Sequence, residues 1–314
     1  MTEHRLETGV AIHGGVGTLP VDRMTPELEA DYRAGLRDAL LAGHDVLSLR
    51  GTAVEACVAA VRVMEDSPLF NAGRGSNFDE RGVITMDASI MRGDDRQAGA
   101  VAGVSDVRSP VRLAQLVMER SEHVLLTDAG AEAFARAQGM EETEPAFFHT
   151  DRRWEELELA RAAGAGRPNV LGDDPTAKAG TVGAVARDAS GLLAAATSTG
   201  GMANKTWGRV GDSPIIGAGT WASELCAVSC TGWGELFLRN AVAFDVHARM
   251  AYGGASLGAA AEAVVHHTLG ARVAGSGGLV ALDAEGRIEF SFNTPGMYRG
   301  WVDETGEPRV AIYR

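Results

Sequence analysis

The sequence predicts an α/β fold in which β-sheets stack face to face and helices cover their outer faces. Two observations support this fold class. Short apolar stretches typical of strands and longer segments with Ala, Leu and Val at helical spacing follow one another along the chain, twice over. No segment of roughly 20 to 50 residues repeats, so a solenoid is not expected.

The N-terminal half supplies the first round of strands and helices. An apolar run at residues 10–12 predicts a buried strand, and the glycine-rich residues 13–17 predict a tight turn after it. Thr52 is placed to cap the second of two helices. The predicted segments are helices at 26–49 and 52–65, strands at 83–91 and 98–104, and helices at 111–119 and 131–138.

A change of pattern separates the two halves of the chain. Mixed charges and turn residues replace the periodic pattern after residue 140, so we expect a flexible tail at about 140–180. Apolar strands then resume on both sides of a hairpin turn at 188–191. The predicted segments are strands at 181–186, 192–197, 215–220 and 225–231, helices at 235–252 and 256–269, and a meander over 278–314.

Length and composition limit the classes of protein that remain. The 314 residues are 45% hydrophobic and 23% charged, as expected of a globular protein with a large core. The net charge of −13 argues against nucleic acid or a membrane surface as partner, because both attract clustered Lys and Arg. We find no secretory signal, no apolar membrane span, and too few cysteines for a disulfide framework. A cytoplasmic protein is therefore expected.

The junction at the end of the predicted tail carries the candidate chemistry. Gly180 leads directly into an apolar strand that begins with Thr181. A threonine hydroxyl needs a nearby base, and a threonine at a new chain terminus carries one in its own α-amine, with an unperturbed pKa of roughly 7.7–8.0. Gly180 has no Cβ and tolerates the strained dihedrals of a scissile peptide. The alternative is a plain junction between a loop and a strand, which these two residues alone would favour.

Seven longer motifs occur along the chain. They are His13-Gly14-Gly15, Phe70-Asn71-Ala72-Gly73-Arg74-Gly75, Met86-Asp87-Ala88-Ser89-Ile90-Met91, Gly180 to Ala186, Gly208-Arg209-Val210-Gly211-Asp212-Ser213-Pro214, Cys230-Thr231-Gly232, and Asn293 to Gly300. With these motifs the whole chain resembles the plant-type asparaginase and isoaspartyl peptidase family of N-terminal-nucleophile (Ntn) hydrolases. In that family the residue matching Thr181 is the self-cleaving nucleophile.

The resemblance implies roles for three further polar residues. Thr199 would donate a hydrogen bond that positions the Thr181 hydroxyl. Arg209 would take the α-carboxylate of a substrate and Asp212 its α-ammonium group, because charge-assisted hydrogen bonds of this kind are strong in a partly dry site. From the residues alone, Thr199 is also compatible with a polar strand end, and Arg209 with Asp212 is compatible with a surface ion pair.

The resemblance also implies an oxyanion hole and supporting groups. The Thr231 hydroxyl and the Gly232 N–H would face the charge that develops on the amide oxygen. The Gly234 carbonyl would help to hold the substrate ammonium, and Asn71 would steady the scissile bond or the oxyanion. Read without the family, Thr231 and Gly232 are compatible with an ordinary strand end, and Asn71 with a turn residue.

A structural sodium ion is the only metal that the resemblance implies. The loop 64–74 resembles the sodium-binding loop of the family, which binds through main-chain carbonyls. None of the eight histidines stands in the spacing of a metal hydrolase, and residues 13–17 lack the full dinucleotide-binding pattern. The positions that match the sodium loop are Met64, Glu65, Ser67, Phe70, Ala72 and Arg74.

The fold implied by the resemblance is the four-layer αββα sandwich of Ntn-hydrolases, as a single domain over 1–314. Self-cleavage would give chains 1–180 and 181–314, assembled as an (αβ)2 homo-oligomer that needs no organic cofactor. The expected reaction is hydrolysis of L-asparagine to aspartate and ammonia, together with cleavage of β-aspartyl dipeptides. Trp207 and Trp233 depart from the family pattern and put the substrate preference in doubt. The alternatives are a glycosylasparaginase of the same superfamily and an uncleaved protein that binds aspartate-like ligands.

Overall fold

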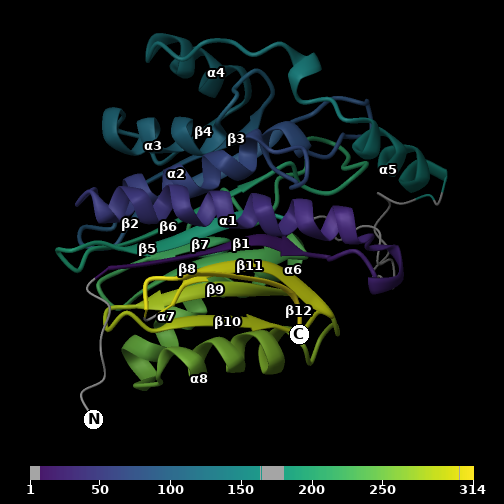
Figure 1. Cartoon of the computed structure of the whole chain (residues 1–314). Helices are drawn as coiled ribbons and strands as arrows, with labels where there is room; N and C mark the ends of the chain where they lie inside the picture. Colours follow the sequence, from purple (N-terminus) through teal and green to yellow (C-terminus); the bar gives the residue numbers. More distant parts are fainter. Residues whose placement is uncertain (1–7, 163, 165–179, 304) are drawn as a thin grey trace.

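The protein folds into four layers of secondary structure. The structure is a computed structural model that describes residues 8–162, 164, 180–303 and 305–314. Two β-sheets lie face to face in the middle, and helices cover the outer face of each sheet (Figure 1). The predicted α/β class with its αββα layers is therefore confirmed.

The larger sheet has eight strands in the order β12-β11-β1-β5-β6-β2-β3-β4. Neighbouring strands run antiparallel except for β3 with β4. β5 lies at the centre, paired with β1 on one side and β6 on the other. The strands are β1 (Gly9–Val16), β2 (Met86–Arg92), β3 (Ala98–Val104), β4 (Leu125–Thr127), β5 (Val182–Arg187), β6 (Leu193–Thr199), β11 (Gly296–Val302) and β12 (Pro308–Tyr313).

The smaller sheet packs on the inner face of the larger one. Its order is β10-β9-β8-β7, formed by β7 (Thr220–Ala222), β8 (Cys226–Gly232), β9 (Gly277–Asp283) and β10 (Ile288–Phe292). Small side chains such as Ala11, Ala195 and Ala227 fill much of the layer between the sheets, so the two backbones approach closely. Val10 and Ile12 alternate with Ala11 and point to the helical side of β1, as the period of a strand requires.

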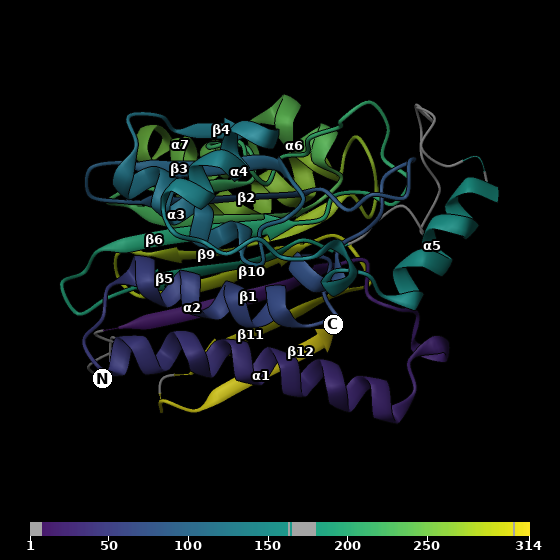
Figure 2. The same cartoon turned by 90° about the horizontal axis from the view of Figure 1, so that it is seen from above.

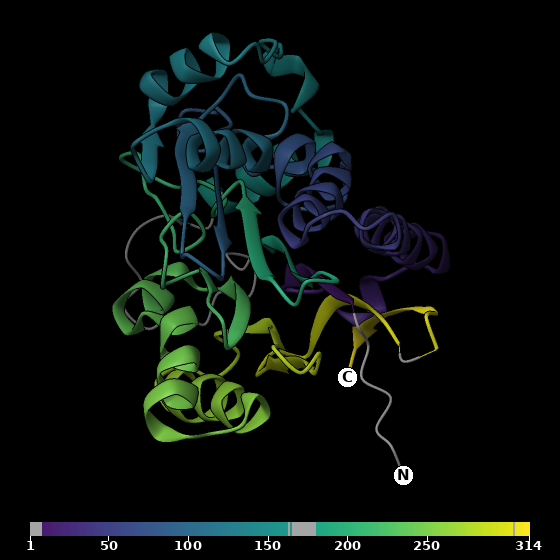
Figure 3. The same ribbon diagram turned by 90° about the vertical axis from the view of Figure 1, so that its left-hand side faces the viewer.

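Helices form the two outer layers, which lie on opposite sides of the strands in Figure 3. Thr52 begins α2 with a capping box, because its hydroxyl accepts from Glu55 N while the Glu55 carboxylate accepts from Thr52 N. The larger sheet carries α1 (Pro26–Ser48), α2 (Ala53–Asp66), α3 (Pro110–Arg120) and α4 (Asp128–Ala137). The smaller sheet carries α6 (Gly234–Asn240), α7 (Val242–Gly253), α8 (Leu257–Glu262) and the π-helical η5 (Ala263–Leu269). Short 3-10 turns complete the elements at η1 (Val21–Arg23), η2 (Gly73–Gly75) and η3 (Pro145–Phe147).

The predicted glycine turn at 13–17 is wrong, because β1 continues to Val16. The register of β1 against β11 shifts between His13 and Gly15, so the glycines form a bulge within a paired strand. Pairing with β11 extends through Gly15 and Val16, whereas β5 pairs with β1 only as far as His13. The pairing with β11 overrides the turn tendency of glycine. The bulge matters for function because it lies against Gly180.

Three further predictions differ from the structure. The predicted strand at 215–220 is a run of turns, and β7 begins only at Thr220. Ala241 adopts a left-handed conformation, with φ of 46°, and divides the predicted helix at 235–252 into α6 and α7. The C-terminal meander is real but is shared between the sheets, because β9 and β10 join the smaller sheet while β11 and β12 join the larger one.

Part of the predicted tail at 140–180 is a helix, α5 (Asp151–Ala162), which lies at one end of the molecule (Figure 2). Arg152 donates to the Tyr32 hydroxyl at 2.6 Å, and Arg153 donates to the Gly75 carbonyl at 2.6 Å. These contacts anchor a helix whose sequence carries no clear apolar stripe. Residues 163 and 165–179 of the predicted tail lie outside the described residues.

Candidate active site

Thr181 stands at the head of the central strand β5, buried between the two sheets. Its hydroxyl donates to Thr199 Oγ1 at 3.2 Å, across the β5–β6 pair. Its backbone nitrogen donates to Thr231 Oγ1 at 3.4 Å, which comes from β8 of the smaller sheet. Thr231 Oγ1 also accepts from Val16 N at 3.1 Å. The structure therefore brings Thr199 to the hydroxyl of Thr181 and Thr231 to its backbone nitrogen, so that the three predicted threonines meet at one place.

The Gly180–Thr181 junction packs directly against the bulge of β1. Gly15 has φ of 103°, and a Cβ built on it would overlap the Cα of Gly180. A Cβ built on Gly180 would lie 3.0 Å from the Gly15 Cα and 3.1 Å from the Gly14 carbonyl oxygen. The glycine before Thr181 is thus required by close approach of two backbones, which adds a second reason to the conformational one given by the sequence.

His13 anchors the backbone of Thr181, a contact that sequence analysis missed. Its Nδ1 lies 2.9 Å from the Thr181 carbonyl oxygen and its Nε2 lies 2.9 Å from Ser229 Oγ. Burial lowers the pKa of the imidazole to about 3, so the ring is neutral, with Nδ1–H donating and Nε2 accepting. A Cβ on Gly183 would lie 2.5 Å from His13 Nε2, so only a glycine leaves room for the ring at that position. Buried hydroxyls of Thr197, Thr220 and Ser89 continue the network from Ser229.

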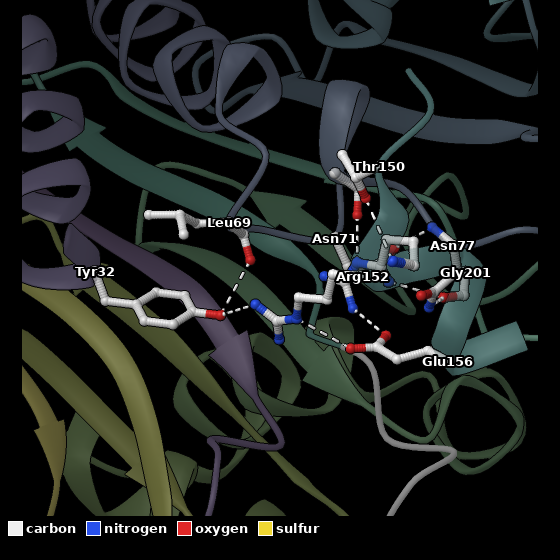
Figure 4. A network of polar contacts seen from close by, with 10 residues as sticks. Tyr32, Leu69, Asn71, Asn77, Thr150, Arg152, Glu156 and Gly201 are labelled. Atoms are coloured by element: carbon white, nitrogen blue, oxygen red, sulfur yellow. Dashed lines mark hydrogen bonds and ion pairs between the residues drawn. The ribbon is translucent and has the colours of Figure 1, made fainter. Parts of the chain in front are cut away.

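The turn after Thr199 is held by two asparagines (Figure 4). Asn71 Nδ2 and Asn77 Nδ2 each donate to the Gly201 carbonyl oxygen at 2.8 Å, and Asn71 Oδ1 accepts from Asn77 N. Gly201 N in turn donates to Thr199 Oγ1 at 3.0 Å. The Asn71 side chain thus contacts this turn and Asn77, and it connects to Thr181 through Gly201 and Thr199.

Arg209, Asp212 and Gly234 converge at the other side of the site. A Cβ on Gly234 would lie 2.7 Å from Arg209 Nη2 and 3.0 Å from Asp212 Oδ1, so only a glycine fits between them. Arg209 Nε and Nη2 bind the Glu235 carboxylate at 2.9 and 3.1 Å. Glu235 was missed by the sequence analysis, although it directly follows Gly234. The Glu235 carboxylate occupies one edge of the Arg209 guanidinium. The remaining nitrogen, Nη1, faces the turn at Gly201, and a Cβ built on Gly201 would lie 3.5 Å from it.

Asp212 is a buried carboxylate with an unused oxygen. Its Oδ2 has no hydrogen-bond partner among the described atoms. Burial raises the pKa of the carboxyl to about 7, against the opposing effect of Arg209. An unpartnered carboxylate oxygen beside a glycine-lined space is suited to accept from a small cationic group.

The loop 64–74 packs its own main-chain carbonyls against two glycines. The carbonyl oxygen of Glu65 lies where a Cβ on Gly73 would stand, and that of Phe70 lies where a Cβ on Gly75 would stand. The Glu65 side chain is committed elsewhere, since it accepts from Ser109 Oγ and Ser198 Oγ.

The two tryptophans that depart from the family pattern lie differently. Trp207 is 87% exposed, has φ of 53° and is held only through its backbone, which donates to Glu80. Trp233 precedes α6 and packs against the core of the smaller sheet. Trp207 therefore stands at the rim, next to Gly208 and Arg209, and does not form the floor of the site.

A four-layer αββα sandwich with a threonine leading its central strand, bonded through hydroxyl and nitrogen to two other threonines, defines an Ntn-hydrolase. The sequence model of the asparaginase family matches residues 6–312, and the chain belongs to that family. It is 50% identical to the isoaspartyl peptidase of Salmonella typhimurium, over 97% of this chain and 98% of that protein. The isoaspartyl peptidase of Escherichia coli is 48% identical over 97% and 96%, respectively. The plant-type L-asparaginase of Pyrococcus abyssi is 38% identical over 96% and 99%.

We expect Asp212→Asn to raise the Tm by a few degrees at pH 8. The folded chain raises the pKa of this carboxyl from 3.8 to about 7, so the folded state binds the proton more tightly than the unfolded state. The resulting penalty is absent below pH 4, grows as the pH rises to 7 and is complete above it. Thermal unfolding between pH 4 and 8 measures the effect, which should vanish toward pH 4.

Asp188→Asn is the matched control for this experiment. Asp188 is equally buried, but its oxygens accept from Ala53 N, Ser190 N and Leu192 N. Its replacement should lower the Tm, because bonded donors lose a charged acceptor. A Tm for Asp212→Asn at or below that of the wild type at pH 8 would contradict the argument that the buried Asp212 carboxylate destabilises the folded state.

Proposed function

We propose that this chain cleaves itself between Gly180 and Thr181 and then hydrolyses L-asparagine and β-aspartyl dipeptides. The observation that carries the proposal is the pair of contacts at Thr181, from its hydroxyl to Thr199 and from its nitrogen to Thr231. The names of the relatives, isoaspartyl peptidase and plant-type L-asparaginase, support the substrate class.

Maturation uses the same hydroxyl as hydrolysis. Thr181 Oγ1 attacks the Gly180 carbonyl carbon, an ester forms as the peptide bond breaks, and the hydroxyl proton passes to the Thr181 nitrogen. Water then hydrolyses the ester and leaves a free α-amine at Thr181. The close packing of Gly180 against Gly15 holds the scissile peptide beside the nucleophile.

Hydrolysis then follows the acyl-enzyme scheme. The free Thr181 amine takes the hydroxyl proton while Oγ1 attacks the side-chain carbonyl carbon of the substrate. The Thr231 hydroxyl and Gly232 N–H donate to the oxyanion, and the amine returns the proton to the departing ammonia or amino acid. Water releases aspartate from the ester on Thr181, and the cycle closes.

Charged groups would set the length of side chain that reaches Thr181. Asp212 Oδ2, which has no described partner, and the Gly234 carbonyl would accept from the substrate ammonium, and Arg209 would pair with the α-carboxylate. Because both ends of the α-carbon are held, only an aspartyl side chain places its carbonyl at Oγ1. Glutamine carries one more methylene and would overshoot, and displacements of about 1 Å are costly in such a geometry.

Three expectations accompany this activity. Main-chain carbonyls of the loop 64–74, with Glu65 and Phe70 among them, would bind a structural sodium ion and stiffen the loop that carries Asn71. The cleaved unit would pair as (αβ)2, and the protein would act in the cytoplasm without an organic cofactor. No helix in the described part of the chain is long and apolar enough to cross a membrane.

Thr181→Ala should leave the chain intact and inactive, because one hydroxyl performs both the acyl shift and the attack on substrate. Thr181→Ser should keep partial cleavage. A denaturing gel of purified protein, with an assay on asparagine and β-aspartyl-leucine, measures both effects. Processing of the alanine variant into two chains would remove Thr181 from the reaction, and a wild type that stays in one piece would support the uncleaved binding protein.

Arg209→Lys should raise KM for asparagine by more than about tenfold and leave self-cleavage unchanged, since a point charge cannot reproduce a bidentate grip. Glu235→Gln should raise KM less, because the amide still supports one edge of the guanidinium. Steady-state kinetics on the cleaved enzymes measures the difference. An unchanged KM in Arg209→Lys would show that Arg209 does not hold the carboxylate.

A further inference from the structure

Lys205 is a buried lysine that the reaction scheme above does not use. It lies in the segment between β6 and β7, and the residue is only 5% exposed. Its Nζ donates to the Thr85 carbonyl oxygen at 2.6 Å and to the Gly200 carbonyl oxygen at 2.7 Å. No carboxylate of the described residues lies within 4.0 Å of Nζ. Burying an ammonium group without a direct counter-ion costs stability, which calls for a functional reason.

One peptide unit connects this ammonium to the nucleophile. The Gly200 carbonyl oxygen accepts from Lys205 Nζ, and the N–H of the same peptide, on Gly201, donates to Thr199 Oγ1 at 3.0 Å. Thr199 Oγ1 also accepts from Thr181 Oγ1 at 3.2 Å. A positive charge on the carbonyl oxygen polarises the peptide and strengthens its N–H as a donor. Lys205 therefore acts on Thr181 through a single peptide and a single hydroxyl.

The peptide is held rigidly between its neighbours. A Cβ on Gly200 would lie 2.6 Å from Asn71 Oδ1, and a Cβ on Gly201 would lie 3.1 Å from Lys205 Nζ. Asn71 and Asn77 hold the carbonyl oxygen of the following peptide, on Gly201, as Figure 4 shows. A dipole fixed in this way needs no reorganisation when charge develops nearby.

We propose that Lys205 is a positioning residue that stabilises the negative charge developing on Thr181 Oγ1 during attack, acting through the Gly200–Gly201 peptide on Thr199. The Thr199 hydroxyl, which accepts from Thr181 Oγ1 at rest, turns to donate to that oxygen as it loses its proton. It serves self-cleavage and hydrolysis alike, and both parts rest on the proposed function. Lys205 keeps its own protons throughout, since the hydroxyl proton passes to the Thr181 nitrogen.

The surroundings of Lys205 make its charge sensitive to pH. Burial lowers the pKa of the ammonium group to about 8, Asp87 and Asp79 act to raise it, and Arg209 acts to lower it. Arg81 and Asp128 face the same cavity of about 90 Å³, into which Lys205 and Asp87 also point. The positive charge is present below pH 8 and is lost as the pH rises through that value. Both reactions should therefore slow above pH 8.

Self-cleavage of the newly made chain provides the test. In the intact chain Thr181 N is an amide and no substrate is present, so neither the Thr181 amine nor a substrate ammonium can titrate. Chains labelled in a cell-free synthesis are chased between pH 6 and 10, and the cleavage rate is read from a denaturing gel. The variants are Lys205→Met, Lys205→Arg and Asp87→Asn.

The wild type should cleave more slowly above pH 8. Lys205→Met should be slower by roughly tenfold to a hundredfold at pH 7, less than the loss of a direct oxyanion donor, and should show no decline at pH 8. Lys205→Arg should stay active without a decline up to pH 10, because a guanidinium keeps its charge there. In Asp87→Asn the decline should move to lower pH, since a carboxylate that favours the charged lysine is gone.

A wild-type rate in Lys205→Met, or a decline that stays at the same pH in that variant, would overturn the proposal. If Lys205→Met does not fold, a decline at an unchanged pH in Asp87→Asn and Lys205→Arg would overturn it equally. The proposed hydrolytic activity fails separately, when the cleaved wild type hydrolyses neither asparagine nor β-aspartyl dipeptides, and the cleavage rates still decide the role of Lys205. A wild type that does not cleave at any pH would overturn both proposals.

Discussion

The pairing of β5 with β1 and β6 is the constraint on which the rest of the site depends. It places Thr181 at the point where the two sheets meet, so that Thr199 and Thr231 reach it from different sheets. His13 on β1 reinforces this placement through the Thr181 carbonyl. Thr181 is therefore positioned by strand registers, which are rigid, and a one-residue slip would turn its side chain to the other face.

Two charged groups near Thr181 are buried in surroundings that do not fully neutralise or hydrogen-bond them. Asp212 has an unpartnered oxygen within the described structure, and Lys205 is buried without a direct counter-ion there. Each costs stability. In the proposed reaction the negative group would receive the substrate ammonium, and the positive one would stand behind the proposed nucleophile Thr181. Buried charged groups of this kind are typical of sites that bind a ligand or carry out a reaction. They connect the fold to the proposed chemistry.

Periodic segments could be predicted from the sequence, and long-range contacts could not. Ala98–Val104 and the 188–191 hairpin turn follow from local pattern, and the αββα layers follow from the family resemblance. The bulge at Gly15 escaped because pairing with β11, which is distant in sequence, overrides glycine's turn tendency. Glu235 and Lys205 escaped because their partners are distant in sequence or are backbone carbonyls, which leave no trace in side-chain pattern.

The most direct test of the account is peptide mapping of the wild-type protein after rapid quenching with asparagine. The account predicts a new N-terminus at Thr181 and an aspartyl ester on that same residue. A chain that remains continuous through Gly180 and Thr181, or an aspartyl group found on another side chain, would contradict the assignment of Thr181 as the nucleophile.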